Sequence, residues 1–303
     1  MENIHKIIFF NFFHNGDIFA SRTFIKKIID HIKKSKPNTE FFYVHKNSPL
    51  ILLDIPDLTI TTKYLPYITS EYSGDFIIGE HLFIPTWYAC NKRFYMNQYD
   101  VSFDCLYTIF QDICQRNLGF SLTDISTDPI DFFPDIDYTY YNTKNITEWL
   151  SKNPNKKVFV SNCAALSGQT GNINLVRITH GLAKRFPNHI FILTNKEGQI
   201  ITDCPNVIYS KDIIKFTGFD LNENAFLSNH CDVIVGPCSG SFSFSINKTN
   251  YFQRNPKIIA LYNTPGKLWL NKIFSDKITY SADILVSSDT NETNITNLII
   301  SKL

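Results

Sequence analysis

The chain has 303 residues, 44% of them hydrophobic and 19% charged, and its formal net charge is +1. This length and composition predict about two domains with packed cores and argue against global disorder. A net charge so close to zero gives no indication of a nucleic-acid-binding protein. The seven cysteines form no Cys-x-x-Cys pair, which argues against a disulfide framework or a zinc ribbon and favours a reducing compartment.

The apolar run at residues 7–13 is short and ends in a polar turn, so we interpret it as a buried strand rather than a signal peptide. No segment reaches the ~18 apolar residues that a membrane-spanning helix requires. The sequence therefore predicts a cytoplasmic protein without a transmembrane segment. Peripheral contact with a membrane surface stays open.

The first half opens with a predicted strand, turn, helix and strand. Residues 6–13 form an apolar strand that the turn 14–17 interrupts. Isoleucines then recur at helical spacing from Ile18 to Ile32, and the segment 35–38 ends that helix. Residues 41–44 form the next strand, which completes a βαβ unit.

Later elements are predicted from the same two periodicities. Further strands are expected at 58–64, 75–79, 157–161, 189–194, 206–209, 232–236 and 257–262, the last being the final clear strand. Helices are expected at 102–118, from a cap at Asn145, along the face that Leu175 begins, and at 221–230. The segment 128–143 has two prolines and no period, so we place the domain boundary there.

These elements predict an α/β fold of two Rossmann-like halves, 1–140 and 141–303, facing each other across a cleft. Open α/β sheets bind ligands at the carboxyl ends of their strands, so the turns at those ends are the candidate sites.

The first candidate site is the turn after the first strand. Gly16 allows a tight turn or a close backbone approach to a ligand. Asp17 then lies at the cap or first turn of the helix, where it is a candidate catalytic base or simply a favourable cap. We expect the helix terminus to lower the pKa of Asp17. His14 is the alternative base, because histidine titrates near neutral pH.

The second candidate site is the small-residue turn that follows strand 232–236 and precedes a helix expected from Phe242. Backbone N–H groups and serine hydroxyls there could bind an anion. A third turn, at residues 167–172, follows the first strand of the second half and resembles neither a dinucleotide fingerprint nor a Walker loop. The two turns would fit one diphosphate, with candidate residues Ser167, Gly168, Gln169, Thr170, Pro237, Cys238, Ser239, Gly240 and Ser241.

Two further patterns are weaker indications of a functional site. Asp135 and Asp137 have the spacing of a DxD metal motif, but no apolar strand leads into them. No other His, Cys, Asp or Glu group has metal-ligand spacing, so no metal site and no cofactor are predicted. Aromatic residues at 84–99, Trp87 and Tyr88 among them, could stack on a sugar ring or fill the core of the first domain.

Together these stretches resemble the glycosyltransferase B (GT-B) fold, and most closely the lipopolysaccharide heptosyltransferases of glycosyltransferase family 9. The resemblance rests on residues 12–18, which include the Gly16-Asp17 pair, and on the strand, Ser239-Gly240 turn, helix and strand near the C-terminus. It implies that Asp17 is the catalytic base and that the C-terminal turn binds the diphosphate of a nucleotide sugar. The lysine that the family usually carries in the loop 164–172 is absent here.

The resemblance implies an inverting, metal-independent glycosyltransferase with acceptor binding in the first domain and donor binding in the second. Asn15, Gly16, Trp87 and Tyr88 would contact the acceptor, a glycan or a lipid-linked sugar. Two alternatives remain open: a nucleotide-sugar epimerase or phosphorylase on the same scaffold, and a non-catalytic sugar-binding or structural protein.

Overall fold

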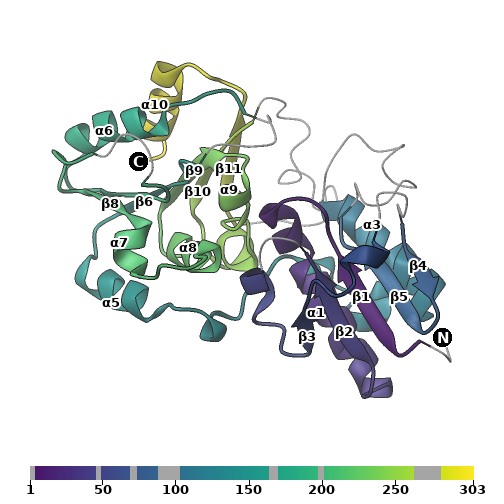
Figure 1. Ribbon diagram of the computed structural model, residues 1–303. Coiled ribbons are helices and arrows are strands. Elements are labelled where there is room, and N and C mark those ends of the chain that lie inside the picture. The colour runs from purple at the N-terminus through teal and green to yellow at the C-terminus, as the bar shows by residue number, and fades with distance from the viewer. Residues whose placement is uncertain are drawn as a thin grey trace. The chain divides into compact units, whose positions relative to one another are not determined.

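A computed structural model describes residues 4–45, 49–68, 74–87, 103–163, 170–196, 201–262 and 281–303 (Figure 1). The chain divides into two compact units, and the first break lies between Asp135 and Ile136. Each unit has its own sheet and its own buried core, so we describe them separately.

The first unit is built on a five-stranded sheet with the order β3-β2-β1-β5-β4. All neighbouring strands are parallel except β4 and β5, which are antiparallel. The strands and helices are β1 Lys6–Phe10, α1 Asn15–Ser35, β2 Glu40–Val44, β3 Leu58–Ile60, β4 Phe76–Ile78, β5 His81–Pro85, α3 Phe103–Ile113 and α4 Leu122–Ile125. The opening βαβ unit and the helix after residue 102 confirm the predictions, whereas β5, a central strand, was not predicted.

Apolar and aromatic side chains hold α1 in place. The Phe24 ring of α1 stacks on the Phe110 ring of α3, with centroids 4.7 Å apart, and on the Phe132 ring at 5.3 Å. One polar interaction joins this core: the guanidinium of Arg22 on α1 pairs with the carboxylate of Asp54, and both side chains are fully buried. The middle of α1 is therefore packed on several sides.

The second unit is a six-stranded, fully parallel sheet with the order β11-β10-β9-β6-β7-β8. Numbered within the unit, this is the 3-2-1-4-5-6 order of the Rossmann fold. The elements are α5 Lys144–Lys152, β6 Lys157–Val160, α6 Leu175–Arg185, β7 Ile190–Leu193, β8 Val207–Tyr209, α7 Ser210–Ile214, α8 Leu221–Ser228, β9 Val233–Pro237, α9 Gly240–Ser243, β10 Lys257–Leu261, β11 Asp283–Ser287 and α10 Glu292–Ile300.

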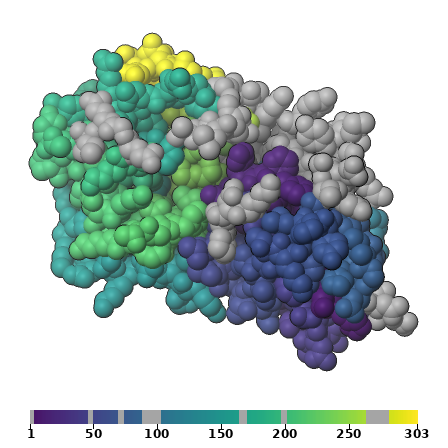
Figure 2. Space-filling view, in the orientation of Figure 1, coloured from purple at the N-terminus to yellow at the C-terminus, as the bar shows by residue number. Residues whose placement is uncertain are grey.

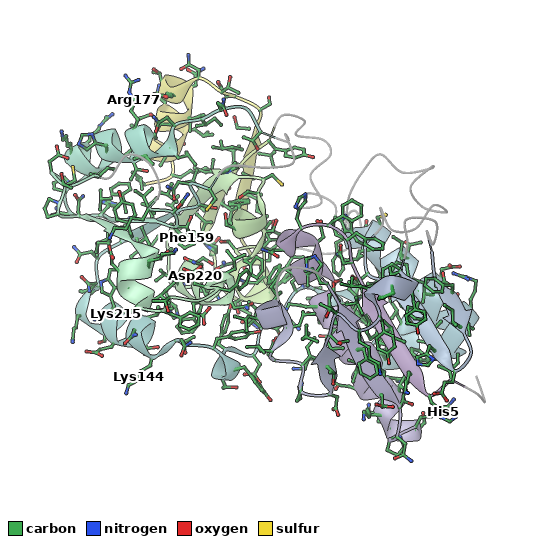
Figure 3. The ribbon with its side chains drawn as sticks, viewed as in Figure 1. His5, Lys144, Phe159, Arg177, Lys215 and Asp220 are labelled. Carbon is green, nitrogen blue, oxygen red and sulfur yellow. The ribbon has the colours of Figure 1, made fainter. Side chains whose placement is uncertain are left out.

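Helices cover both faces of this sheet. One face packs against α6 and α10, which lie next to each other in Figure 1, through a cluster that includes Val160, Leu182 and Ile295. Helices α5, α7 and α8 group on the other side of the sheet. Phe159 is buried in the unit, whereas Lys144 and Arg177 extend into solvent (Figure 3). The C-terminal residues of α10 form part of the unit's surface (Figure 2).

Several local predictions were wrong. The helix expected from Phe242 is the single turn α9, which ends at Ser243. Thr143, not Asn145, stands at the N-cap of α5, because the Asn145 amide turns inward and donates to the Ile214 carbonyl. The sequence also missed β11 and α10. All six cysteines within the described residues are free, and none of the described helices is long and apolar enough to cross a membrane.

Candidate active site

The carboxyl end of β1 is the switch point of the first sheet, because the chain continues to β2 on one side of β1 while β5 lies on the other. The turn 11–14 leaves the sheet here. It is shaped by Asn11, whose side-chain oxygen accepts the Phe13 backbone N–H at 2.7 Å. The turn exposes two aromatic rings, those of Phe12 (41% exposed) and Phe13 (38%). Helix α1 begins directly after it.

Asp17 lies at the third position of α1, in the first turn, as the sequence predicted. It is not the N-cap, which is His14. Instead the Asp17 carboxylate reaches back, and its Oδ2 accepts the His14 backbone N–H at 2.9 Å. The side chain is half-buried. Asp17 therefore stabilises the helix start while lying at the carboxyl edge of the sheet.

The electrostatic environment of Asp17 differs from the one expected. Burial raises its pKa from 3.8 to about 6, and this outweighs the lowering effects of the His14 N–H bond and the His14 charge. The expectation that the helix terminus lowers this pKa was therefore wrong: desolvation is the larger effect. A carboxylate with a pKa near 6 is mostly ionised at neutral pH and a much better proton acceptor than an ordinary aspartate.

The other predicted site residues of the first unit do not all lie on the turn beside Asp17. His14 is exposed, Asn15 is half-buried and Gly16 is buried, all on the turn beside Asp17. Trp87 follows β5, on the other side of the switch point, but only 9% of it is exposed, which favours the core role over sugar stacking. Tyr88 lies outside the described residues.

Three buried polar residues at this edge were not predicted. The Asn11 Nδ2 amide is buried and has no hydrogen-bond partner among the described residues. His45, at the end of β2, bonds through Nε2 to the Phe13 carbonyl at 2.9 Å. Thr86, at the end of β5, is bonded to the Tyr43 hydroxyl at 3.1 Å. A polar residue directly after a predicted strand is the sequence signal that could have identified His45; Asn11 lay inside the predicted strand 6–13, and Thr86 follows a strand that was not predicted.

The second sheet has its switch point between β6 and β9, where the strand order reverses. The Ser161 hydroxyl, directly after β6, bonds to the Ser241 hydroxyl at 2.8 Å, and Ser241 is also 3.1 Å from the Ser239 hydroxyl. Gly236 on β9 makes this approach possible, since a Cβ there would lie 2.7 Å from the Ser161 Cβ. The predicted turn is therefore joined to the neighbouring strand end, and Ser161 is a residue that sequence analysis missed.

The two turns predicted to bind the diphosphate both donate a hydrogen bond to the same backbone carbonyl. The Thr170 hydroxyl and the Cys238 backbone N–H both donate to the Leu261 carbonyl, at 3.0 Å each. Pro237, Cys238 and Ser239 are buried, so only Gly240 and Ser241 of this turn are partly accessible. Because α9 is one turn long, a helix dipole adds little here. Ser167, Gly168 and Gln169 lie outside the described residues.

The strand ends continue the polar edge toward β7. Asn162 bonds to the backbone of Asn195 in both directions, accepting its N–H at 2.7 Å and donating to its carbonyl at 2.9 Å. Lys196 follows, and its ammonium pairs with Asp212 at 3.0 Å on the surface. An exposed ion pair of this kind is weak and easily exchanged. Lys196 is therefore a basic residue at the carboxyl edge that could meet a phosphate.

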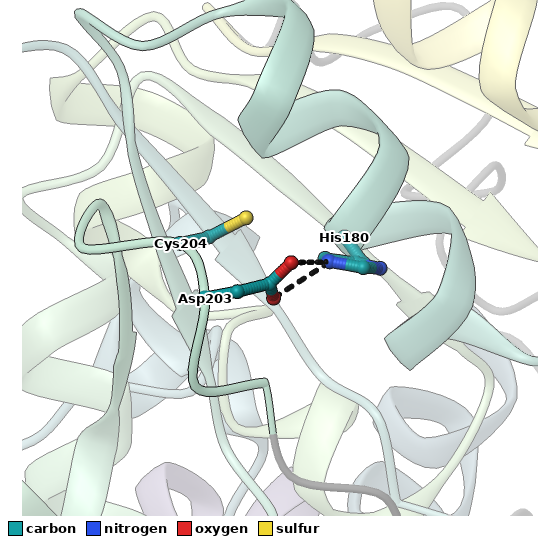
Figure 4. A group of neighbouring side chains, drawn as sticks. All are labelled: His180, Asp203 and Cys204. Atoms are coloured by element: carbon teal, nitrogen blue, oxygen red, sulfur yellow. Dashed lines mark hydrogen bonds and ion pairs between the residues drawn. The ribbon is translucent and has the colours of Figure 1, made fainter.

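The structure also assembles a group that spacing alone did not indicate. His180, Asp203 and Cys204 bring one potential metal-ligand atom each to within 4.8 Å of one another (Figure 4). Asp203 already pairs with His180 at 2.8 Å and with Lys184 at 2.9 Å, and these bonds lower its pKa to about 2. The group precedes β8 and lies away from the carboxyl edge. Asp137, of the DxD-like pattern, caps a short turn by accepting the Thr139 N–H.

No family model matches the sequence, and no curated protein matches it. Solved structures do match. The glycosyl transferase family 9 protein of Veillonella parvula DSM 2008 is 14% identical, with a TM-score of 0.54 over 99% of this chain and 92% of that one. ADP-heptose LPS heptosyltransferase II of E. coli is 11% identical (TM-score 0.54, 98% of both chains), and E. coli heptosyltransferase WaaC, solved with ADP, is 10% identical (0.50, 98% and 100%). The resemblance read from the sequence is confirmed at the level of fold: the chain has the α/β architecture of GT-B glycosyltransferases.

Proposed function

We propose that this protein is a glycosyltransferase that moves a sugar from a nucleotide-sugar donor to a hydroxyl acceptor, with inversion and without a catalytic metal ion. The observation that carries the proposal is Asp17: a half-buried carboxylate with a pKa of about 6, at the carboxyl end of the central strand of an α/β sheet. Fold similarity to enzymes solved with ADP supports the donor class.

Asp17 acts as the general base. Its carboxylate takes the proton of the acceptor hydroxyl as the oxygen attacks the anomeric carbon and the bond from that carbon to the diphosphate oxygen breaks. Attack opposite the leaving group inverts the configuration at that carbon. The His14 N–H holds the carboxylate in one orientation throughout. The exposed rings of Phe12 and Phe13 offer the acceptor sugar a stacking surface beside the base.

The second unit binds the donor diphosphate at the β6/β9 switch point. The hydroxyl of Ser241 and the backbone at Gly240 are the accessible donors of the turn. Lys196 supplies positive charge after leaving its surface pair with Asp212. Negative charge that develops on the departing nucleoside diphosphate is met by these groups. The free thiols fit a cytoplasmic location for this chemistry.

A donor screen tests the proposal. Thermal stability is measured with UDP-, GDP-, ADP- and CMP-sugars, and the stabilising donor is then incubated with glycan acceptors in the presence of EDTA. We expect one nucleotide class to raise Tm, and release of nucleoside diphosphate to require the acceptor. Lys196→Gln should reduce the stabilisation, whereas Lys184→Gln, which removes an equally exposed lysine paired with Asp203, should not.

Each of the other possible outcomes would indicate a different function. Conversion of the donor without an acceptor would indicate an epimerase. Phosphate-dependent cleavage of a glycan would indicate a phosphorylase. Stabilisation without turnover would indicate a binding protein, and no stabilisation by any nucleotide sugar would contradict donor binding altogether.

A further inference from the structure

A second polar site lies at the opposite edge of the second sheet. A pocket of about 210 Å³ opens at the amino ends of β6, β9 and β10. Strands of four and five residues separate this edge from the switch point by roughly 13–16 Å. Its lining includes Lys157, His189, Asp232, Arg254, Lys257 and Lys302. We call it the basic pocket.

Positive charge exceeds negative charge around the basic pocket. Lys257 and Lys302 share one carboxylate, that of Asp283, at 3.4 and 2.7 Å. Asp232 is engaged with the backbone N–H of Lys157 at 2.8 Å. Within the described residues, the Lys156 ammonium lies 3.4 Å from the main-chain oxygen of Leu303, the last residue, whereas no side-chain carboxylate lies within ion-pair distance of Lys157 or Arg254. The pocket therefore has two cations, Lys157 and Arg254, that no side-chain carboxylate of the described residues pairs.

Several of these groups are also buried. Lys157 is only 6% exposed, and its ammonium bonds to a neutral carbonyl, that of Asn155, at 2.7 Å. The Arg254 Nη1 and both ring nitrogens of His189 are buried without a hydrogen-bond partner among the described residues. Buried donors without acceptors are rare in folded proteins because each costs free energy. Their convergence on one pocket indicates a missing acceptor.

The positive field extends to neighbouring residues. Burial lowers the pKa of His230, and the charges of Arg254 and Lys157 lower it further.

The volume of the basic pocket limits the size of its occupant. Drug-sized ligands occupy roughly 300–1,000 Å³, and this pocket is smaller. A nucleotide sugar is therefore too large, whereas a compact anion fits.

We propose that the basic pocket binds a small phosphate-type dianion, which accepts hydrogen bonds from Arg254 and His189 and pairs with Lys157 and Lys302. A tetrahedral dianion suits these donors because a guanidinium binds phosphate oxygens in bidentate fashion while lysines add point charges. The occupant joins the starts of three strands to the C-terminal residues Lys302 and Leu303, so its binding stabilises the second unit.

Isothermal titration of the full chain with inorganic phosphate, at constant ionic strength set with chloride, tests the proposal. We expect one site per chain and a matching rise in Tm. Arg254→Gln should weaken binding by about ten- to a hundredfold, since one charge-assisted partner is lost. Lys302→Gln, at the accessible rim, gives a second measurement if Arg254→Gln folds poorly.

Two control variants test whether phosphate binds in the basic pocket. Lys184→Gln removes the same charge from α6 outside the pocket, and Ser241→Ala alters the switch point; both should leave phosphate affinity unchanged. Equal weakening by Lys184→Gln would show non-specific attraction and overturn the proposal. Weakening by Ser241→Ala alone would place the phosphate at the donor site and overturn it too. Absence of binding to the wild type would mean that the cations only hold the C-terminal residues.

Discussion

Replacing Asp17 with asparagine should affect activity and stability in opposite directions. Asparagine keeps the shape of the side chain, and its Oδ1 can still accept the His14 N–H that the carboxylate accepts at 2.9 Å. It cannot take a proton from an acceptor hydroxyl. Loss of the base should therefore lower turnover by about a hundredfold or more. In the wild type, kcat/KM should rise with pH and level off above an apparent pKa of about 6.

The stability effect follows from the same pKa. Because burial raises the folded-state pKa from 3.8 to about 6, the folded protein holds a proton that the unfolded chain has lost between those pH values. The wild type therefore loses stability as pH rises through that window. A pKa difference of about two corresponds to at most about 3 kcal/mol, and water around the half-buried side chain reduces this to about 1–2 kcal/mol. Asp17→Asn should regain that amount above pH 6 and nothing below pH 4.

Urea unfolding at pH 4, 6 and 8, together with turnover measured at each pH, checks both expectations. Asp30→Asn is the matched control, because Asp30 is an exposed aspartate of the same helix. An aspartate that only complements the helix dipole would behave differently. Its replacement by asparagine would lower the free energy of unfolding by about 0.3–1 kcal/mol at pH 8. A less stable Asp17→Asn protein, or one with normal turnover, would therefore refute the reasoning.

Two predictions concern the scaffold. Gly236→Ala should destabilise the second unit by about 1–3 kcal/mol, because the new methyl would meet the end of β6. Gly181→Ala, in the middle of α6 with open space around it, should instead raise the free energy of unfolding by about 0.5–1 kcal/mol. Equal effects of the two substitutions in urea unfolding would contradict the close packing at the switch point. Asp54→Ala should cost about 3–5 kcal/mol by leaving the buried Arg22 charge unpaired, and a loss below 1 kcal/mol would show that the pair is not buried in solution.

The sequence predicted the elements whose periodicity is strong. Helix α1 and the parallel strands β1, β2, β6 and β9 are continuous apolar runs or clear helical faces, and each appears where expected. It missed β5, because five residues beside a long aromatic stretch carry no distinctive period. It missed β11 because the apolar run of that strand is only three residues long, Ile284 to Val286, between polar residues.

The candidate site was only partly predictable. Asp17 could be identified because a glycine and an acid follow an apolar strand, but the direction of its pKa shift could not. That shift depends on how deeply the folded protein buries the carboxylate, which the sequence does not reveal. Ser161 and Lys196 were missed for the same reason. Each follows an ordinary strand, and only the order of the strands places Ser161 beside the turn that contains Ser241 and Lys196 at the same carboxyl edge of the sheet.

The two units supply different kinds of chemistry, and this bears on the absent family lysine. The first presents a carboxylate that burial makes more basic, which suits proton transfer. The second presents neutral hydroxyl and backbone donors at its switch point, with Lys196 at the rim. Neutral donors in a partly buried turn stabilise a developing negative charge without first being desolvated as ions. Under the proposed function, such a site would release a nucleoside diphosphate more readily than one with a fixed lysine. The absence of the lysine from the sequence therefore does not by itself argue against that function.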